Sequence, residues 1–502
     1  MSLPRRRFIS ASAAAAGWLA SAPFGFLSAL PRVTAADVQA KPLLFAPEVE
    51  PLVRLLEETP RERAVEQIVA RIKSGTSYQE ILSALLLAGV RNIQPRPIGF
   101  KFHAVLVINS AHLASIASPE QDRWLPILWA VDQFKSSQAA DVREGNWTLA
   151  PVDESAVPAS HRAKAALIAA MDQWDESAAD SAIAGYARTA GAHDIFDTLC
   201  RYGMRDFREL GHKAIYLANS YRTLDVIGWR HAEPVLRSLV YAQLDRVGEK
   251  QNPSKADLPA DRPYRRNLER LKEIRAGWLD GKADSDATRQ MLHALRQRSA
   301  NDASAKAVEL LNKGAAVNSL YDAFFTAAAE LVMRAPGISS LHAVTFTNAL
   351  RYMFDHCRDE ETRKLIVLQN AAFIPLYRSR TAAGEKVEID EFEPGHLEAS
   401  GRNGIEEIFT TLSSDKLLAA RKALAYLKSG SDPKPILDAG RRLVFLKGRD
   451  SHDYKFSSAV LEDFHGIATP WRDRFLAGNV FLFRGARESD TDLAQRIRSA
   501  LG

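Results

Sequence analysis

The chain has 502 residues, of which 46% are hydrophobic and 25% are charged, a globular balance in a chain long enough to bury a large core. The net charge of +5 is small and partly reflects three arginines at residues 5–7, so composition gives no electrostatic case for a nucleic-acid partner. Abundant alanine, leucine and arginine, with few alternating β-branched runs, predict an all-α fold, a single large bundle-like helical domain.

The first 36 residues match a twin-arginine export signal. Residues 5–10 read Arg-Arg-Arg-Phe-Ile-Ser, an alanine-rich apolar stretch follows over 11–30, and small residues at 34–36 offer a cleavage point. Glycine, serine and proline interrupt the apolar stretch, so it makes a poor permanent membrane span, although an uncleaved anchor is the alternative. We therefore expect the twin-arginine machinery to export the protein to the periplasm or another extracytoplasmic space, with a catalytic domain over 40–502.

Helical spacing of apolar residues recurs along most of the chain. The pattern predicts two or three amphipathic helices over 43–95, among them 60–73 and 77–88. Further expected elements, in chain order, are an aromatic-rich core helix over 124–134 (or an aromatic pocket wall), a loop-like segment over 136–160, helices over 161–187 and 192–207, a proline-broken connecting excursion over 247–310 with a surface helix at 267–276, a helix over 362–377, a loop-like acidic stretch over 385–398, a packed tail over 471–484 and a terminal helix over 490–501.

Four apolar segments each carry one histidine near their start. The clearest is 211–224, where a buried helix is predicted to begin beside His212. Similar segments contain His103, His342 and His452. Because helices of a bundle build metal sites from side chains that face its interior, four such segments can bring four imidazoles to one ion. The alternative for each is a hydrogen-bonded histidine of the core.

Two other histidines compete for a place in the site. His112 lies nine residues after His103 on the same predicted helix, about half a turn out of phase, so the two should point to opposite faces. His231 forms a His-x-Glu with Glu233 at a helix start, where residues two apart diverge. We keep His231 as an alternate ligand only.

Polar residues follow the histidines at regular offsets. Asn109, Asn219 and Asn348 come six or seven residues after theirs and are candidates to fix imidazole tautomers, to orient a substrate or to bond within the core. Lys455 comes three residues after His452, where a charged amine would repel a cation. It must point away, lose its proton or react with carbon dioxide to give an anionic carbamate ligand.

Neutral imidazoles suit iron, copper, nickel and zinc. No CxxC or Cys/His spacing of a structural zinc site occurs, and the two cysteines, Cys200 and Cys357, are expected to be buried free thiols, with one disulfide as the alternative. A zinc-dependent hydrolase is disfavoured because there is no HExxH motif. The remaining alternative to an enzyme is a helical scaffold or binding protein with core histidines.

The order of these segments resembles the questin oxidase-like family. The segments that carry the resemblance are 341–345, 452–455, 211–215 and 102–106 followed by 124–134, within roughly 95–465. The resemblance implies an all-α, non-haem iron oxygenase that opens rings of aromatic, quinone-like small molecules with dioxygen. It implies Fe(2+), with zinc or copper as alternatives, on His103, His212, His342 and His452, with Lys455 as a possible modified ligand. Lys455, Asn219 and Asn348 are then the candidates for catalysis.

Overall fold

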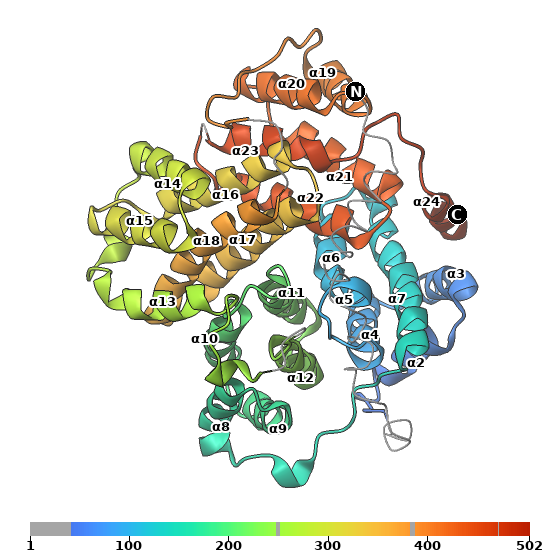
Figure 1. Ribbon diagram of the computed structural model, residues 1–502. Helices are drawn as coiled ribbons and strands as arrows, with labels where there is room; N and C mark the ends of the chain where they lie inside the picture. The colour runs from blue at the N-terminus through green and yellow to red at the C-terminus, as the bar shows by residue number, and fades with distance from the viewer. Residues whose placement is uncertain (1–41, 247–250, 382–386, 470) are drawn as a thin grey trace.

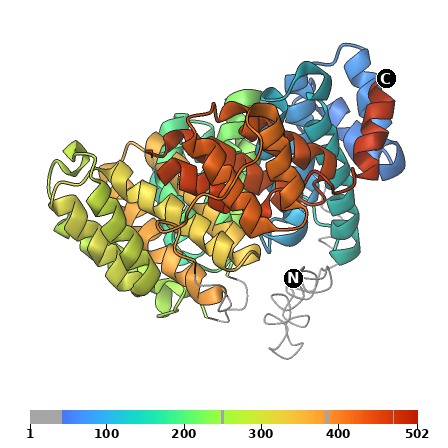
Figure 2. The same ribbon diagram turned by 90° about the horizontal axis from the view of Figure 1, so that it is seen from above.

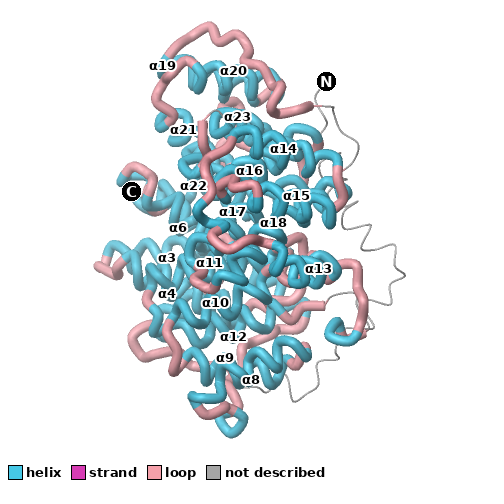
Figure 3. Tube along the Cα trace, turned by 90° about the vertical axis from the view of Figure 1, so that its left-hand side faces the viewer, coloured by secondary structure: helices cyan, strands magenta, loops and turns pink. Residues whose placement is uncertain are grey.

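The computed structural model describes residues 42–246, 251–381, 387–469 and 471–502. Within these ranges the regular structure is helical, and the single β-bridge recorded there pairs Lys282 with Ala315. Figure 3 shows helices joined by loops throughout the described chain. The predicted all-α fold is therefore confirmed, whereas the predicted export signal at 1–36 lies outside the described residues.

Four helices form a closed ring at the centre of the molecule. They are α6 (Ile108–Ile116), α11 (His212–Ile227), α17 (Ile338–His356) and α22 (Ser451–Asp463). Each packs against the next, from α6 to α11, α17, α22 and back to α6. The short helix α5 (His103–Leu106) leads directly into α6. All four predicted histidine segments thus belong to one central unit.

The other helices surround this ring in groups (Figure 1). One group contains α2 (Glu50–Glu58), α3 (Arg61–Lys73), α4 (Tyr78–Asn92), α7 (Leu125–Glu144) and the C-terminal α24 (Asp492–Leu501), which lies beside α3 and α7 (Figure 2). A second contains α8 (Ser160–Gln173), α9 (Glu176–Ala187), α10 (Ala192–Gly203) and α12 (Ala232–Gln243). A third contains α13 (Arg262–Arg270), α14 (Ser285–Gln297), α15 (Ala300–Asn312), α16 (Val317–Arg334) and α18 (Glu360–Arg380). The last contains α19 (Gly401–Leu412), α20 (Lys416–Lys428), α21 (Lys434–Lys447) and α23 (Trp471–Asn479).

The helices form where apolar periodicity and capping residues agree. At the start of α4, the Ser77 hydroxyl accepts from the backbone N–H of Glu80, and the Glu80 carboxylate accepts from the N–H of Ser77 at 2.8 Å. This reciprocal cap satisfies donors that the first turn leaves free. The apolar side chains of α4 then join a hydrophobic core shared by all the groups. No helix in the described ranges is both long and apolar enough to cross a membrane.

The segment 136–160 departs from the prediction. It was expected to be loop-like, yet α7 continues to Glu144. Two buried charged residues in the second half of α7 have partners distant in sequence. The Lys135 ammonium donates to the carbonyl oxygens of Leu56 and Glu57, and the Asp141 carboxylate accepts from the backbone N–H of Gln94 at 2.9 Å. The polar residues of this part of α7 are buried because they form hydrogen bonds with distant segments, and the spacing of polar and apolar residues along the sequence does not reveal such bonds.

The stretch 247–310 also differs in detail. The surface helix expected at 267–276 is instead α13, which ends at Arg270, and its Asn267 is buried and donates to Gln369 Oε1 at 2.8 Å. The same stretch contains α14 and α15, which pack against α16 and α18. The excursion is thus integrated into the helical core. Cys200 and Cys357 are buried free thiols, as predicted.

Candidate metal centre

The four histidines lie at the starts of helices that meet in the central ring. His103 and His212 are the first residues of α5 and α11, His452 is the second of α22, and His342 is the fifth of α17. The predicted single helix over 102–112 is divided between α5 and α6, with Val107 between them. Because they lie at or near helix starts, the four imidazoles gather at one end of the ring of helices and not along its length.

The backbone before His212 requires glycine. Gly211 has φ of 81°, a left-handed conformation that favours glycine. A Cβ atom at Gly211 would approach Phe346 Cδ2 to 2.4 Å and the Tyr377 hydroxyl to 2.7 Å. Because both the dihedral angle and the close packing exclude a side chain, glycine lets α11 begin directly at the histidine.

Three of the imidazoles converge through the same ring nitrogen. His212 Nε2 lies 2.8 Å from His103 Nε2 and 2.9 Å from His342 Nε2. One ligand atom from each of the three lies within 4.8 Å of the other two. These three residues could therefore hold a metal ion, as the sequence predicted.

The opposite ring nitrogens establish which atoms carry protons. His212 Nδ1 faces the carbonyl oxygen of Glu209, and His342 Nδ1 faces that of Ile338 at 2.7 Å. A carbonyl oxygen only accepts, so each Nδ1 is the protonated nitrogen. Burial lowers the pKa of both rings, which favours their neutral forms. Each Nε2 then presents only a lone pair.

Two lone pairs that face each other at 2.9 Å repel unless a cation lies between or beside them. A proton is disfavoured there, because burial and neighbouring charge lower the pKa of the rings. A metal ion satisfies both nitrogens without protonating either ring. The arrangement of donors therefore fits a metal.

His452 adjoins this trio without belonging to the closest set. Its ring centroid lies 4.4 Å from that of His103 and 5.4 Å from that of His342. Its Nδ1 is 3.4 Å from Asp450 Oδ1, while its buried Nε2 has no hydrogen-bond partner among the described residues. A carboxylate on one nitrogen and a free lone pair on the other are the usual surroundings of a metal-binding histidine. His452 is thus placed as a fourth candidate ligand.

Lys455 lies on α22 one turn after His452. The residue is 3% exposed, and its Nζ has no hydrogen-bond partner within the part of the chain that the structure describes. Burial lowers the pKa of Lys455 to about 7, although the Asp450 carboxylate acts in the opposite direction. The amine is therefore neutral in a large fraction of molecules at neutral pH, which resolves the charge conflict noted in the sequence.

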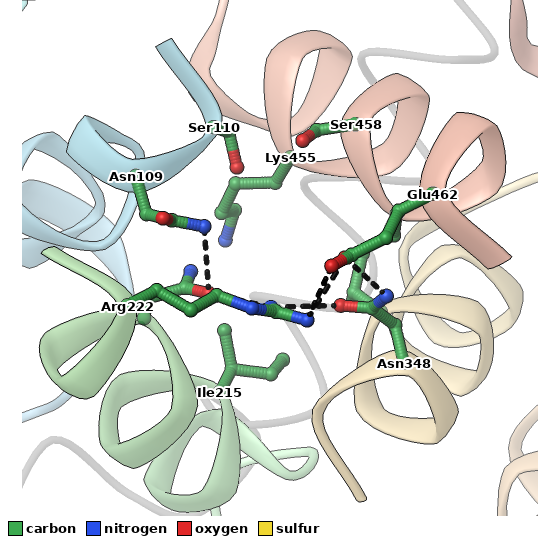
Figure 4. Close-up of a pocket in the computed structure, with 11 residues that line it drawn as sticks. Asn109, Ser110, Ile215, Arg222, Asn348, Lys455, Ser458 and Glu462 are labelled. Carbon is green, nitrogen blue, oxygen red and sulfur yellow. Dashed lines mark hydrogen bonds and ion pairs between the residues drawn. The ribbon is translucent and has the colours of Figure 1, made fainter. Parts of the chain in front are cut away.

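The three asparagines lie on α6, α11 and α17, where they line a small cavity (Figure 4). Asn219 and Asn348 do not set the tautomers of His212 and His342, because backbone carbonyls occupy that position on both rings. That part of the prediction is wrong, and the reason is local: the first turn of a helix already supplies carbonyl oxygens within reach of a ring. Asn219 Nδ2 donates to Leu106 O at 2.9 Å, and Asn348 Nδ2 donates to Glu462 and Asp463.

The two competing histidines have other partners. His112 Nδ1 lies 3.0 Å from the hydroxyl of Tyr78 on α4, so it faces away from His103, as its phase predicted. His231 is buried just before α12, where its Nε2 accepts from Arg230 Nε at 3.1 Å. Neither is in the group of converging ligand atoms. The alternate ligand His231 is therefore not brought to the site.

The aromatic helix expected at 124–134 forms part of the core. Trp129 stacks on Tyr454 of α22 with ring centroids 4.0 Å apart, and both are buried. The residues that line the cavity of Figure 4 are mainly polar and do not include this helix. Trp129 thus packs behind α22, and α7 does not form a wall of the cavity.

Sequence reasoning missed Asp450, Arg222 and Glu462. Asp450 caps α22, accepting from the backbone N–H of His452 at 2.7 Å, and also lies against the His452 ring. Arg222 and Glu462 each lie ten residues after a histidine, on the side of the helix that faces the ring interior. Continuing the helical stripe beyond Asn219 on α11 and beyond Lys455 on α22 would have found both.

No family model, no curated protein and no solved structure matches this chain. What the molecule shows by itself is an all-α fold whose central helices bring together histidines that could hold a metal ion.

Proposed function

We propose that this protein is an exported, non-haem iron-dependent oxygenase of the questin oxidase-like type, acting on an aromatic or quinone-like small molecule. One observation carries the proposal: the Nε2 atoms of His103, His212 and His342 converge, while backbone carbonyls accept from Nδ1 of the latter two. Imidazoles held in this way are preorganised to bind a cation. Iron in such a site supplies redox chemistry and open positions for dioxygen and substrate.

The spacing of two of the nitrogen pairs fits a six-coordinate ion, a class that includes iron. With metal–nitrogen bonds of about 2.1 Å, two ligands at right angles lie about 3.0 Å apart, and two at the tetrahedral angle lie about 3.4 Å apart. The observed separations of 2.8 and 2.9 Å are nearer the first value. Right-angled ligands belong to six-coordinate ions, which retain positions for other molecules.

Lys455 supplies the anionic ligand in this proposal. Its neutral amine attacks carbon dioxide, a nitrogen–carbon bond forms, one proton leaves to solvent, and the product is a carbamate with two oxygens. The buried Nζ, which has no hydrogen-bond partner in the described part of the chain, supports this assignment, because a carbamate would be drawn to a cation held by the neighbouring histidines. Without such a change, the amine could not lie beside a metal in its charged form.

Metal analysis tests the proposal directly. Elemental mass spectrometry of mature wild-type protein should give about one iron per chain, and His342→Ala should lose it. His112→Ala is the matched control, because that histidine is partnered by Tyr78 and should not affect metal content. Zinc in place of iron would favour a metal-dependent hydrolase. Absence of stoichiometric metal would refute the proposal and leave a helical scaffold with core histidines.

The carbamate has its own spectroscopic test. After exposure to ¹³C-labelled carbon dioxide, wild-type protein loaded with zinc in place of iron should show a carbamate carbon resonance in its NMR spectrum, since paramagnetic iron would broaden it. The resonance should be absent from Lys455→Ala and present in Lys213→Met, in which a different buried lysine is removed. A spectrum that is the same with and without Lys455 would exclude this ligand.

Export by the twin-arginine machinery is part of the proposal and rests on residues 5–10. Replacing Arg5 and Arg6 by lysine keeps the charge but removes the paired arginines. Cell fractionation should then find the variant retained in the cytoplasm and the wild type in the periplasm. Equal export of both would remove this assignment without affecting the metal proposal.

A further inference from the structure

The two cysteines of the chain lie where α10 approaches the end of α17. Cys200 is in the last turn of α10, and Cys357 is the first residue after α17. α10 packs against α11, one of the four ring helices, and against α18, the helix that follows Cys357 (Figure 1). Cys200 is 0% exposed and Cys357 is 4% exposed. Both thiols are therefore enclosed between these elements.

Hydrogen bonds on both sides of the cysteines hold the two segments together. The backbone N–H of Arg358 donates to Asp197 Oδ1 at 2.9 Å. One turn farther along α10, Arg201 Nη2 donates to Asp359 Oδ1 at 3.2 Å. The two α10 residues lie three positions before and one position after the cysteine of that helix, and their partners are the two residues that follow the other cysteine. These bonds therefore bring the backbone around one cysteine close to the backbone around the other.

The two thiols are also neighbours. Burial raises the pKa of the Cys200 thiol, and the Cys357 thiol raises it further through a side-chain hydrogen bond. Such a bond requires the two sulfur atoms to lie within contact range. Four residues before Cys200 on the same face of α10, Phe196 packs on Tyr221 of α11 and Tyr352 of α17, with ring centroids 4.4 and 5.9 Å apart. This face of α10 is thus turned toward the ring helices, and the thiols meet there.

Neither cysteine is part of the candidate metal centre. Within the described ranges, the ligand atoms that could hold an ion together belong to histidines alone. The Cys357 thiol donates to the carbonyl oxygen of Asp359 at 3.8 Å, a weak bond that does not engage Cys200. A single buried cysteine would be explained by packing. Two thiols that segments distant in sequence hold face to face meet the geometric condition for a disulfide.

We infer that Cys200 and Cys357 form an intramolecular disulfide when the folded protein meets an oxidising compartment that contains small disulfides such as oxidised glutathione. Cys357, whose sequence neighbours His356 and Arg358 are exposed, loses its thiol proton and attacks the small disulfide. A mixed disulfide forms, and one glutathione leaves and takes up a proton. Cys200 then loses its proton and attacks the Cys357 sulfur, and the second glutathione leaves in the same way. Two electrons and two protons thus pass from the cysteines to oxidised glutathione, which becomes two thiols.

The disulfide closes a loop that contains two of the four ring helices. His212 on α11 and His342 on α17 lie inside the loop, whereas His103 and His452 lie outside it. A cross-link restricts the unfolded chain, and in the chain-entropy model its effect grows with the length of the loop. The disulfide therefore fixes two of the converging histidines in one covalently closed unit. It does so with or without a metal, and independently of the proposed function.

Peptide mass analysis tests the cross-link. Folded wild-type protein is incubated with oxidised glutathione under nitrogen, remaining thiols are alkylated, and the protein is digested without reduction. The two thiols of the chain should both disappear, and a peptide that joins Cys200 to Cys357 should appear. Cys200→Ala and Cys357→Ala are the matched controls and should give no cross-linked peptide within one chain. Two persistent free thiols, glutathione on both cysteines, or a disulfide between two chains would each overturn the inference.

Thermal unfolding tests what the disulfide holds together. Oxidised wild type should unfold at a midpoint a few degrees above that of the same protein after reduction. Both samples contain a chelator, so that a bound metal does not contribute to the difference. Cys357→Ala should have the same midpoint under the two conditions, and Cys200→Ala serves as a second control. A cross-linked wild type whose midpoint does not rise would overturn the inference that the bond ties α11 and α17 into one unit.

Discussion

Two buried lysines of the central helices have opposite surroundings. Lys213 follows His212 on α11, and its ammonium donates to Asp206 Oδ2 at 2.7 Å and to the carbonyl oxygen of Asp245 at 2.6 Å. Lys455 is buried to the same degree, yet its amine has no hydrogen-bond partner in the described ranges. A buried lysine with a carboxylate is a stabilising part of the core, whereas an unpaired one costs stability. The ion pair of Lys213 accounts for its burial, whereas the burial of Lys455 is accounted for only by the role proposed for it at the metal site.

The largest effect is expected at Lys213. Lys213→Met leaves the buried Asp206 without its ammonium partner, so the free energy of unfolding should fall by about 3 kcal/mol. Denaturant titration measures the change, and metal content should stay at the wild-type level in the folded fraction. The exposed Lys73→Met is the control and should change stability little. If the Lys213 variant is as stable as wild type, the ion pair with Asp206 does not stabilise the core, and the contrast with Lys455 fails.

Lys455→Met should have the opposite effect on stability. Replacing an unpaired buried amine by an apolar side chain of similar length should raise the unfolding free energy of metal-free protein by about 1–3 kcal/mol at pH 7. The same variant should retain less iron than wild type when both are loaded and dialysed together. A variant that is less stable than wild type without metal would mean that Lys455 has a structural partner after all.

The pH dependence of stability sharpens the same comparison. The pKa of Lys455 is about 7 in the folded protein and near its ordinary value of 10.5 in the unfolded chain. Between these values the unfolded chain binds one more proton, so the stability of metal-free protein should rise with pH, by at most about 1.4 kcal/mol per unit. Unfolding titrations at pH 7, 8 and 9 should compare wild type with Lys455→Met. The wild-type slope should approach that of about one proton bound more by the unfolded chain, and this contribution should be absent from the variant. Parallel pH profiles for the two proteins would contradict the low pKa.

The smallest effect is expected at Asp450, which faces the His452 ring and raises the pKa of Lys455 toward its ordinary value. Asp450→Asn keeps a side chain suited to capping α22 but removes the charge. Metal affinity should fall about tenfold, as is usual when a carboxylate behind a ligand histidine is lost. Competition with a chelator measures it, and unfolding of the metal-free variant should confirm that the cap is retained. Unchanged affinity would place His452 outside the site.

Much of the site could be predicted because it follows helix periodicity. The histidine segments were found from apolar spacing alone, and the opposite orientation of His112 followed from its phase relative to His103. Of the roles left open for the asparagines, fixing the imidazole tautomers is wrong for Asn219 and Asn348, since the sequence does not show that the carbonyl oxygens of Glu209 and Ile338 already bind the rings. The continuation of α7 to Glu144 was missed for a similar reason, because its buried polar residues bond to groups far away in sequence.

The sequence by itself determined the helices and which side of each carries histidine, asparagine or charge, because the helical repeat fixes those relations within one segment. Only the tertiary structure decided that four such sides face one another in a ring. This packing pairs Arg222 with Glu462 across 240 positions and leaves Lys455 without a hydrogen-bond partner among the described residues. Such pairings depend on packing between distant segments, and no local repeat encodes them. The same packing converts separate histidines into a candidate metal centre.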